Sequence, residues 1–207
     1  MRAQSMARTG ISKACALLVL AGLCLGALPV TAAGEVAPLD LQTVLLHSAV
    51  TPPARVNFHE ERHNPLLQEP LLLTGYLEYL QAGVLRKVVE TPFQEAFRID
   101  AEHVLIERNG ETRKLSLSKN GSLRTILDVI KAILGGEAEQ IESLFDYELS
   151  GSPASWSLRL VPKSKRISRQ LTSILVRGDV AAANSMRIDL KDGEWYQMDI
   201  LQDDPER

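Results

Sequence analysis

Short segments in which apolar and polar residues alternate recur along most of the sequence after residue 54, and they constrain the fold more than any other feature. A period of two places neighbouring side chains on opposite faces of a strand, so each segment predicts a strand with one buried face. In the segment 71–80, Leu71, Leu73 and Leu77 share one face while Glu78 lies on the other. Strands are predicted in this way at 55–62, 71–80, 84–90, 93–99, 104–106, 113–117, 147–149, 156–160, 174–176, 186–190 and 195–201.

Three segments have a helical period instead. The longest begins after Ser122, a good N-cap residue, and ends at Gly135-Gly136. Residues 38–50 form a second predicted helix, which Pro52-Pro53 ends, and residues 138–144 form a third. The longest helix and the helix at 138–144 form the predicted lid, and the apolar residues that we expect to face the sheet from them are Leu123, Ile126, Leu127, Ile130, Leu134 and Ile141.

The turns between the predicted strands favour antiparallel pairing. Asn109-Gly110 and Asp192-Gly193 are typical of tight hairpin turns. A long antiparallel sheet curls through its own twist, and its concave face then needs a cover. The sequence therefore predicts an α+β fold: a strongly curved antiparallel sheet of about 10 to 11 strands, forming an open half-barrel with a helical lid. The few helices leave two alternatives open, an apolar cavity under the lid or a fully packed core.

The first residues have the pattern of a cleavable secretory signal. Arg2, Arg8 and Lys13 precede an apolar run at 14–30, and small residues close it at Thr31-Ala32-Ala33. We expect cleavage after Ala33, with Ala32 as the second choice, so that residues 1–33 are the signal and 34–207 form one exported domain. The alternatives are an uncleaved membrane anchor or, through Cys24, a lipid anchor, although Leu23 precedes Cys24 where lipidation needs a small residue.

Composition and motifs argue against several functions. Both cysteines lie in the signal segment, so the mature domain can form no disulfide and no cysteine metal site. Removal of three basic residues with the signal takes the formal net charge from −3 to −6, which argues against nucleic acid as a partner. His59 and His63 would lie about 13 Å apart on one strand face, too far to share a metal. We predict a binding protein with no catalytic residue, cofactor or metal.

One basic cluster, residues 163–166 with Arg159 and Arg169 nearby, allows two interpretations. It is either a solvated hairpin tip or a docking surface for an acidic partner or an anionic head group.

Several short strings follow one another in an order and spacing that match a known family. They are Phe58-His59-Glu60-Glu61-Arg62, Pro70-Leu71, Gly75-Tyr76-Leu77, Leu85-Arg86, Thr91-Pro92, Ile133-Leu134-Gly135-Gly136, Phe145, Trp156-Ser157-Leu158-Arg159-Leu160-Val161-Pro162 and Ser185-Met186-Arg187-Ile188 with Asp192-Gly193. Together they resemble the LolA-like family, the periplasmic carriers of outer-membrane lipoproteins and their relatives, over about residues 39–201. Leu80-Gln81-Ala82 and Lys87 depart from the strings of the best-known members.

The resemblance implies a monomeric carrier that binds an acylated lipoprotein or related lipid in an apolar cavity and passes it from an inner-membrane exporter toward an outer-membrane acceptor. It also implies that Arg86 latches the lid by bonding to lid backbone. Two alternatives remain, an acceptor anchored in the outer membrane and a carrier of a different lipid-linked cargo. The residues expected to line the cavity from the sheet are Leu71, Leu73, Leu77, Phe97, Trp156, Leu158, Met186 and Ile188.

Overall fold

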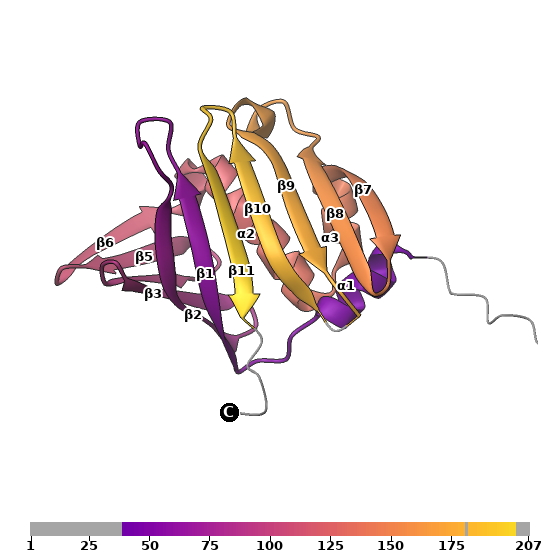
Figure 1. Ribbon diagram of the computed structural model, residues 1–207, viewed down its shortest axis with the longest axis horizontal. Helices are drawn as coiled ribbons and strands as arrows, with labels where there is room; N and C mark the ends of the chain where they lie inside the picture. The colour runs from indigo at the N-terminus through magenta and orange to yellow at the C-terminus, as the bar shows by residue number, and fades with distance from the viewer. Residues whose placement is uncertain (1–38, 181, 202–207) are drawn as a thin grey trace, which may run out of the picture. The chain divides into compact units, whose positions relative to one another are not determined.

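A computed structural model describes residues 39–180 and 182–201. The expected signal segment, residues 1–33, lies outside the described residues. Eleven strands of the described chain form one antiparallel sheet in the spatial order β6-β5-β4-β3-β2-β1-β11-β10-β9-β8-β7. The sheet is not closed, because β6 and β7 are its two edges. The helices lie on one face of the curved sheet (Figure 1). The predicted α+β architecture is therefore confirmed.

The strands follow the alternating segments of the sequence closely. The short segments 147–149 and 174–176 are the main exceptions, because their strands extend by two or three residues to each side. The bounds are β1 Ala54–His63, β2 Leu71–Gln81, β3 Val84–Thr91, β4 Glu95–Ile99, β5 His103–Arg108, β6 Glu111–Ser116, β7 Phe145–Ser152, β8 Ser155–Pro162, β9 Leu171–Gly178, β10 Ala183–Leu190 and β11 Trp195–Leu201.

Tight turns connect neighbouring strands where the sequence predicts them. Asn109 and Gly110 both have positive φ, at 52° and 79°, and they join β5 to β6. Two positive φ angles in succession are the geometry of a type I′ hairpin turn, which matches the twist of the strands that it joins. Such short connections keep consecutive strands side by side. The last strand, β11, pairs with the first, β1, and both lie in the middle of the sheet.

Three α-helices lie in the described chain: α1 Leu41–Ser48, α2 Gly121–Gly135 and α3 Ala138–Leu144. Gly136 ends α2 in the left-handed conformation, as expected of a C-terminal glycine. The start of α2 differs from the prediction. Asn120 is the N-cap and accepts from the Leu123 N–H at 3.1 Å, while Ser122 is buried inside the first turn and donates to Gln170. Two short 3-10 helices, Leu117–Lys119 and Ile167–Arg169, complete the described helices.

The sheet face that carries the helices is called the inner face from here on. Its side chains form three apolar clusters. The largest lies on β7–β10, here called the C-terminal wing, and packs against all three helices. In β8 and β9 the buried positions include Trp156, Leu158, Leu160, Ile174 and Val176. This wing therefore contains the continuous core of the described fold.

The other strands, β6 to β1 and β11, form the N-terminal wing, which is packed less tightly. One of its clusters joins α2 to β4 and β5 through Val104, Leu117 and Leu127. The other consists of strand residues and the neighbouring Phe93. Most positions of β2, β3 and β4 are half-buried, without the clear alternation of β8. No helix among the described residues is long and apolar enough to cross a membrane.

Candidate functional site

An apolar section of the inner face, between the two clusters that contain α2, is the candidate binding surface. Phe58, Leu73 and Val89 are its buried members, with at most 1% of each exposed. No helix residue belongs to this cluster. Its half-buried members are Leu71, Leu77, Phe93, Phe97, Met198 and Ile200. This set of nine residues is called the floor below.

The register of the central strands builds the floor. Phe58 pairs with Gly75, which in turn pairs with Val89 on β3. A side chain at Gly75 is excluded, because its Cβ would lie 1.9 Å from the Val88 carbonyl oxygen. The pairing of β2 with β3 shifts by one residue at this point, between Thr74 and Gly75. Glycine at position 75 therefore lets β3 approach β2 closely under the centre of the floor.

Charged side chains lie directly beside these apolar residues. Glu60 has 3% of its side chain exposed and accepts from Arg62 Nε at 2.5 Å and from Lys87 Nζ. Lys87 Nζ also lies 4.9 Å from the centre of the Phe58 ring. A buried carboxylate is costly unless it is paired and hydrogen-bonded, and here each carboxylate oxygen has a cationic partner.

Burial lowers the pKa of Lys87, and the nearby Glu60 carboxylate opposes that effect in part. Glu95 lies farther along the same face, with Arg108 Nη1 3.9 Å from its carboxylate. By strand register, the inner face of the N-terminal wing thus carries three acidic and four basic side chains: Glu60, Arg62, Lys87, Glu95, Arg108 and, on β6, Glu111 and Arg113. Their formal charges sum to one positive unit.

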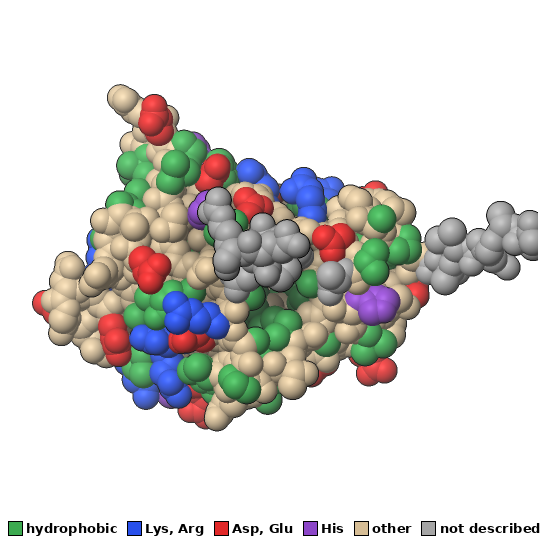
Figure 2. Space-filling model, turned by 60° about the horizontal axis from the view of Figure 1, so that its bottom comes forward, with side chains coloured by type: hydrophobic (Ala, Val, Ile, Leu, Met, Phe, Trp, Pro, Cys, Tyr) green, Lys and Arg blue, Asp and Glu red, His purple; other side chains and the backbone are tan. Residues whose placement is uncertain are grey.

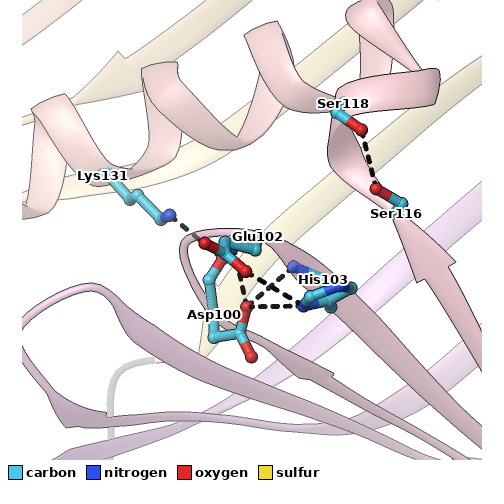
Figure 3. Close-up of polar contacts among 6 residues, drawn as sticks. All are labelled: Asp100, Glu102, His103, Ser116, Ser118 and Lys131. Carbon is cyan, nitrogen blue, oxygen red and sulfur yellow. Dashed lines mark hydrogen bonds and ion pairs between the residues drawn. The ribbon is translucent and has the colours of Figure 1, made fainter.

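Helix α2 lies between the two wings and contacts both. Leu127 and Ile130 pack on the β4–β5 side, while Val129 and Ile133 pack in the core of the C-terminal wing. A polar contact adds to the first side. Lys131 Nζ donates to the Asp100 carbonyl oxygen at 3.3 Å, in the turn between β4 and β5 (Figure 3).

The Asp100 turn that receives Lys131 is itself held by local bonds. The Asp100 carboxylate accepts from the Glu102 N–H at 2.8 Å and from the His103 N–H at 2.7 Å (Figure 3). Both bonds lower the pKa of Asp100. The turn is therefore a preformed acceptor for the lysine of the helix.

The residues predicted to line a cavity fall into two groups. Four belong to the floor: Leu71, Leu73, Leu77 and Phe97, of which Phe97 also packs against the cluster that joins α2 to β4 and β5. The other four, Trp156, Leu158, Met186 and Ile188, belong to the C-terminal core, where they pack with the helices. The alternation of the sequence identified the correct face in both wings, but it did not distinguish a packed region from a helix-free one.

The predicted lid residues also divide. Leu123, Leu127 and Ile130 pack toward β4 and β5, whereas Ile126 and Ile141 pack in the C-terminal core. Leu134 is half-buried, and its carbonyl oxygen accepts from the Val50 N–H at 2.9 Å. Val129 and Ala132 are fully buried, although the predicted stripe omits them. Helix α2 is apolar on two sides because it packs on two wings, and a single-stripe interpretation misses the second side.

Arg86 lies on the opposite face of the sheet from the one expected. It is in register with Glu78, and Glu78 Oε2 accepts from its Nη1 at 3.1 Å. That bond raises the pKa of Arg86. The next residue, Lys87, is in register with Leu77 and Phe97 and so lies on the inner face. The expectation that Arg86 bonds to the lid backbone is wrong for this structure, and Lys87 is the basic residue on the helix side.

Two surface pockets lie away from the floor. One, of about 330 Å³, lies where α1 meets the α2–α3 connection. The other, of about 240 Å³, lies where α2 begins. Both are lined largely by polar residues, so neither offers the apolar wall that an acyl chain needs. Figure 2 shows a different feature, a recess of apolar side chains next to a group of basic and acidic ones.

Metal binding finds no support in the part of the chain that the structure describes. No group of three or more His, Cys, Asp or Glu side chains there could hold a metal ion. His63 instead stacks on Trp195, with 5.4 Å between ring centres.

Comparison with protein-family models identifies the family of the chain. The family model described as "Outer membrane lipoprotein carrier protein LolA-like" matches residues 32–200. No curated protein sequence matches the chain significantly.

Several solved structures are similar to this one at low sequence identity. A LolA superfamily protein from Nitrosomonas europaea is 11% identical with a TM-score of 0.43, and the match covers 80% of this chain and 93% of that one. The lipoprotein LppX from Mycobacterium tuberculosis is 9% identical with a TM-score of 0.42, covering 78% and 93%. A DUF1329 family protein from Desulfovibrio piger is 10% identical with a TM-score of 0.45, covering 79% and 89%. Likeness at this level carries no functional information.

Proposed function

The chain belongs to the LolA-like family of outer membrane lipoprotein carrier proteins, and on that premise we propose that it carries an acylated lipoprotein or related lipid by burying its acyl chains against the floor. The observation that carries this proposal is the floor itself. It is a cluster of apolar side chains on the inner face of the curved sheet, and no helix residue belongs to it. Members of this family are carrier or binding proteins and not enzymes, and they work outside the cytoplasm.

The driving force is the removal of acyl CH₂ groups from water, at about 0.8 kcal/mol for each group buried. Helix α2 occupies the space next to the floor, with Leu123, Leu127 and Ile130 packed on the β4–β5 side. Cargo binding in this proposal separates α2 from that side, while the larger core of the C-terminal wing holds the other side of the helix. The cost of this separation keeps the affinity low enough for cargo to be passed on.

The remaining parts of the proposal concern where the protein works and with what. Residues 1–33 direct export and are removed, which leaves the domain from residue 34 as a monomer in the periplasm. An inner-membrane exporter supplies the cargo and an outer-membrane acceptor takes it.

The proposal is tested by isolating the mature protein from its native compartment under gentle conditions and identifying bound lipid by mass spectrometry. An acylated compound recovered in near-stoichiometric amount is the expected result. Its absence, together with no binding of any added acyl probe, would contradict the proposal. The same sample gives the mass of the N-terminus, which separates a free residue near Gly34 from a lipid-modified Cys24.

A further inference from the structure

The charged residues beside the floor have a use that acyl-chain burial alone does not explain. An apolar surface that binds only hydrocarbon gains nothing from Glu60, Arg62 and Lys87, and burying them has a free-energy cost. Yet Glu60 is almost completely buried and fixes both cations. The arrangement therefore needs a further explanation, and the geometry of Arg62 supplies one.

Arg62 is held by one nitrogen only. Its Nε donates to Glu60 Oε1 at 2.5 Å, and this contact fixes the direction of the guanidinium plane. Among the described residues, no ion pair or hydrogen bond uses its two terminal nitrogens. The side chain is 23% exposed, so the free edge of the guanidinium remains accessible. Guanidinium edges bind carboxylate and phosphate groups through two parallel hydrogen bonds.

The surroundings place this free edge at one end of the floor. Arg62 is in register with Leu71 on β2 and with Tyr196 on β11. Phe58 lies four residues earlier on the same strand face, about 13 Å away by the rise of a strand. A molecule with its head at Arg62 can therefore lay its chain along the floor toward Phe58.

Charge on this face favours an anion. The trio of Glu60, Arg62 and Lys87 has a net charge of one positive unit. The neighbouring pair of Glu95 and Arg108 cancels itself. Two further acids act on Tyr196, the register partner of Arg62. Both have hydrogen-bond partners: Glu194 accepts from Tyr196 and Asn64, and Asp192 accepts from the Glu194 N–H.

We propose that Arg62, oriented by Glu60 and supported by Lys87, binds the acidic head group of the cargo, so that the preferred cargo is an anionic amphiphile with a carboxylate or phosphate head. This inference rests on the proposed carrier function and narrows its cargo. Arg62 touches the head group directly, and Glu60 is a positioning residue. Lys87 Nζ lies over the Phe58 ring. When the anionic head group competes with Glu60 for Lys87, the Phe58 ring becomes more accessible to the acyl chain of the cargo.

A matched control exists on the outer face of the sheet. Arg187 on β10 uses the same bonding pattern, with its Nε donating to Asp189 Oδ1 at 2.9 Å, two residues along the strand. Arg187 is in register with Gln197 and so lies on the face opposite to Met186 and Met198. It therefore has the chemistry of Arg62 without access to the floor.

The test measures binding of hexadecanoic acid, hexadecyl phosphate and hexadecanol, which share one chain length and differ in the head. The probes are titrated at neutral pH and fixed ionic strength, below their aggregation concentrations. We expect at least one of the two acids to bind about ten-fold more tightly than the alcohol, the size of one hydrogen bond to a charged group. The acid that binds more tightly identifies the head as carboxylate or phosphate.

Variants of Arg62 test whether this residue causes the preference for an acidic head group. Arg62→Gln should remove the preference for an acidic head, and Arg62→Lys should keep only part of it, because an ammonium group cannot form the two parallel bonds of a guanidinium edge. Arg187→Gln should leave the preference unchanged, and each variant is shown to be folded by circular dichroism. Equal binding of all three probes to the unmodified protein would overturn the head-group inference and leave the carrier function standing. So would an equal loss of preference in Arg187→Gln. Failure of every probe to bind would instead contradict the carrier function itself.

Discussion

The two wings of the sheet share an alternating sequence pattern, but their inner faces differ in what they bury. The C-terminal wing buries one face of β8 and β9 almost completely and packs it against three helices. The N-terminal wing places Phe58, Leu73 and Val89 on the same face, but beside them lie a buried carboxylate and two cations. Under the proposed function, the first wing provides stability and the second provides the surface that binds the cargo.

The largest effect that separates the wings should come from the buried ion pair. Glu60→Leu removes the partner of Lys87 and is expected to lower the free energy of unfolding by about 3–5 kcal/mol, because it leaves a buried ammonium without a counter-charge. The double variant Glu60→Leu/Lys87→Met should recover most of that loss. Urea unfolding of the two variants checks this, and a double variant as unstable as the single one would show that the pair is not the cause.

Truncation of one leucine in each wing gives the next largest difference. Leu158→Ala in the C-terminal core should lower the free energy of unfolding by about 2–5 kcal/mol, since a fully buried side chain leaves a cavity. Leu77→Ala, on the half-buried floor, should cost clearly less. The same variant should weaken binding of an acyl probe, whereas Leu158→Ala should not. Equal stability losses in both variants would remove the distinction between the wings.

A dependence of stability on pH should come from Lys87. Its pKa in the folded protein is lowered by burial, so between that value and the ordinary 10.5 the unfolded chain binds more protons. The contribution of Lys87 to folding stability must therefore rise with pH in this range. Denaturation of Lys87→Met across the same range should lack that rise. Lys114→Met, at an exposed position of β6, is the control and should keep it.

The smallest effect is expected at the contact between α2 and the N-terminal wing. Lys131→Met loses the bond to the Asp100 carbonyl and should cost about 1 kcal/mol or less. Hydrogen exchange should become faster in α2 while the strands of the C-terminal wing stay unchanged. Arg124→Gln, which affects an ion pair of 4.0 Å within α2 itself, should have no such effect. Unchanged exchange in Lys131→Met would mean that apolar packing alone holds the helix.

The sequence predicts most of the fold because its local signals agree. Asn109-Gly110 specifies a hairpin, and the apolar positions around Leu127 specify a helix with a glycine end. The face of β3 could not be predicted in the same way. Val84 and Val88 alternate with Arg86, but Leu85 and Val89 alternate with Lys87, so both faces of this strand have apolar residues. Only the pairing of Leu77 with Lys87 decides which face turns inward.

The ion pairs beside the floor could not be predicted from local sequence patterns for a related reason. Glu60 and Lys87 are 27 positions apart, and their contact depends on the register of three strands. One signal was present: Lys87 is a departure from the family strings, at a position where the best-known members have tryptophan.

The central claim is that cargo binds on the floor of the N-terminal wing, and photocross-linking tests it most directly. A fatty acid with a photoreactive group in its chain is bound, illuminated and located by mass spectrometry of the peptides. The account predicts labelling in residues 54–99 and 195–201, with additional labelling of α2 where it lies next to the floor. Labelling confined to β7–β10, or to the polar pocket beside Gly136, would contradict it.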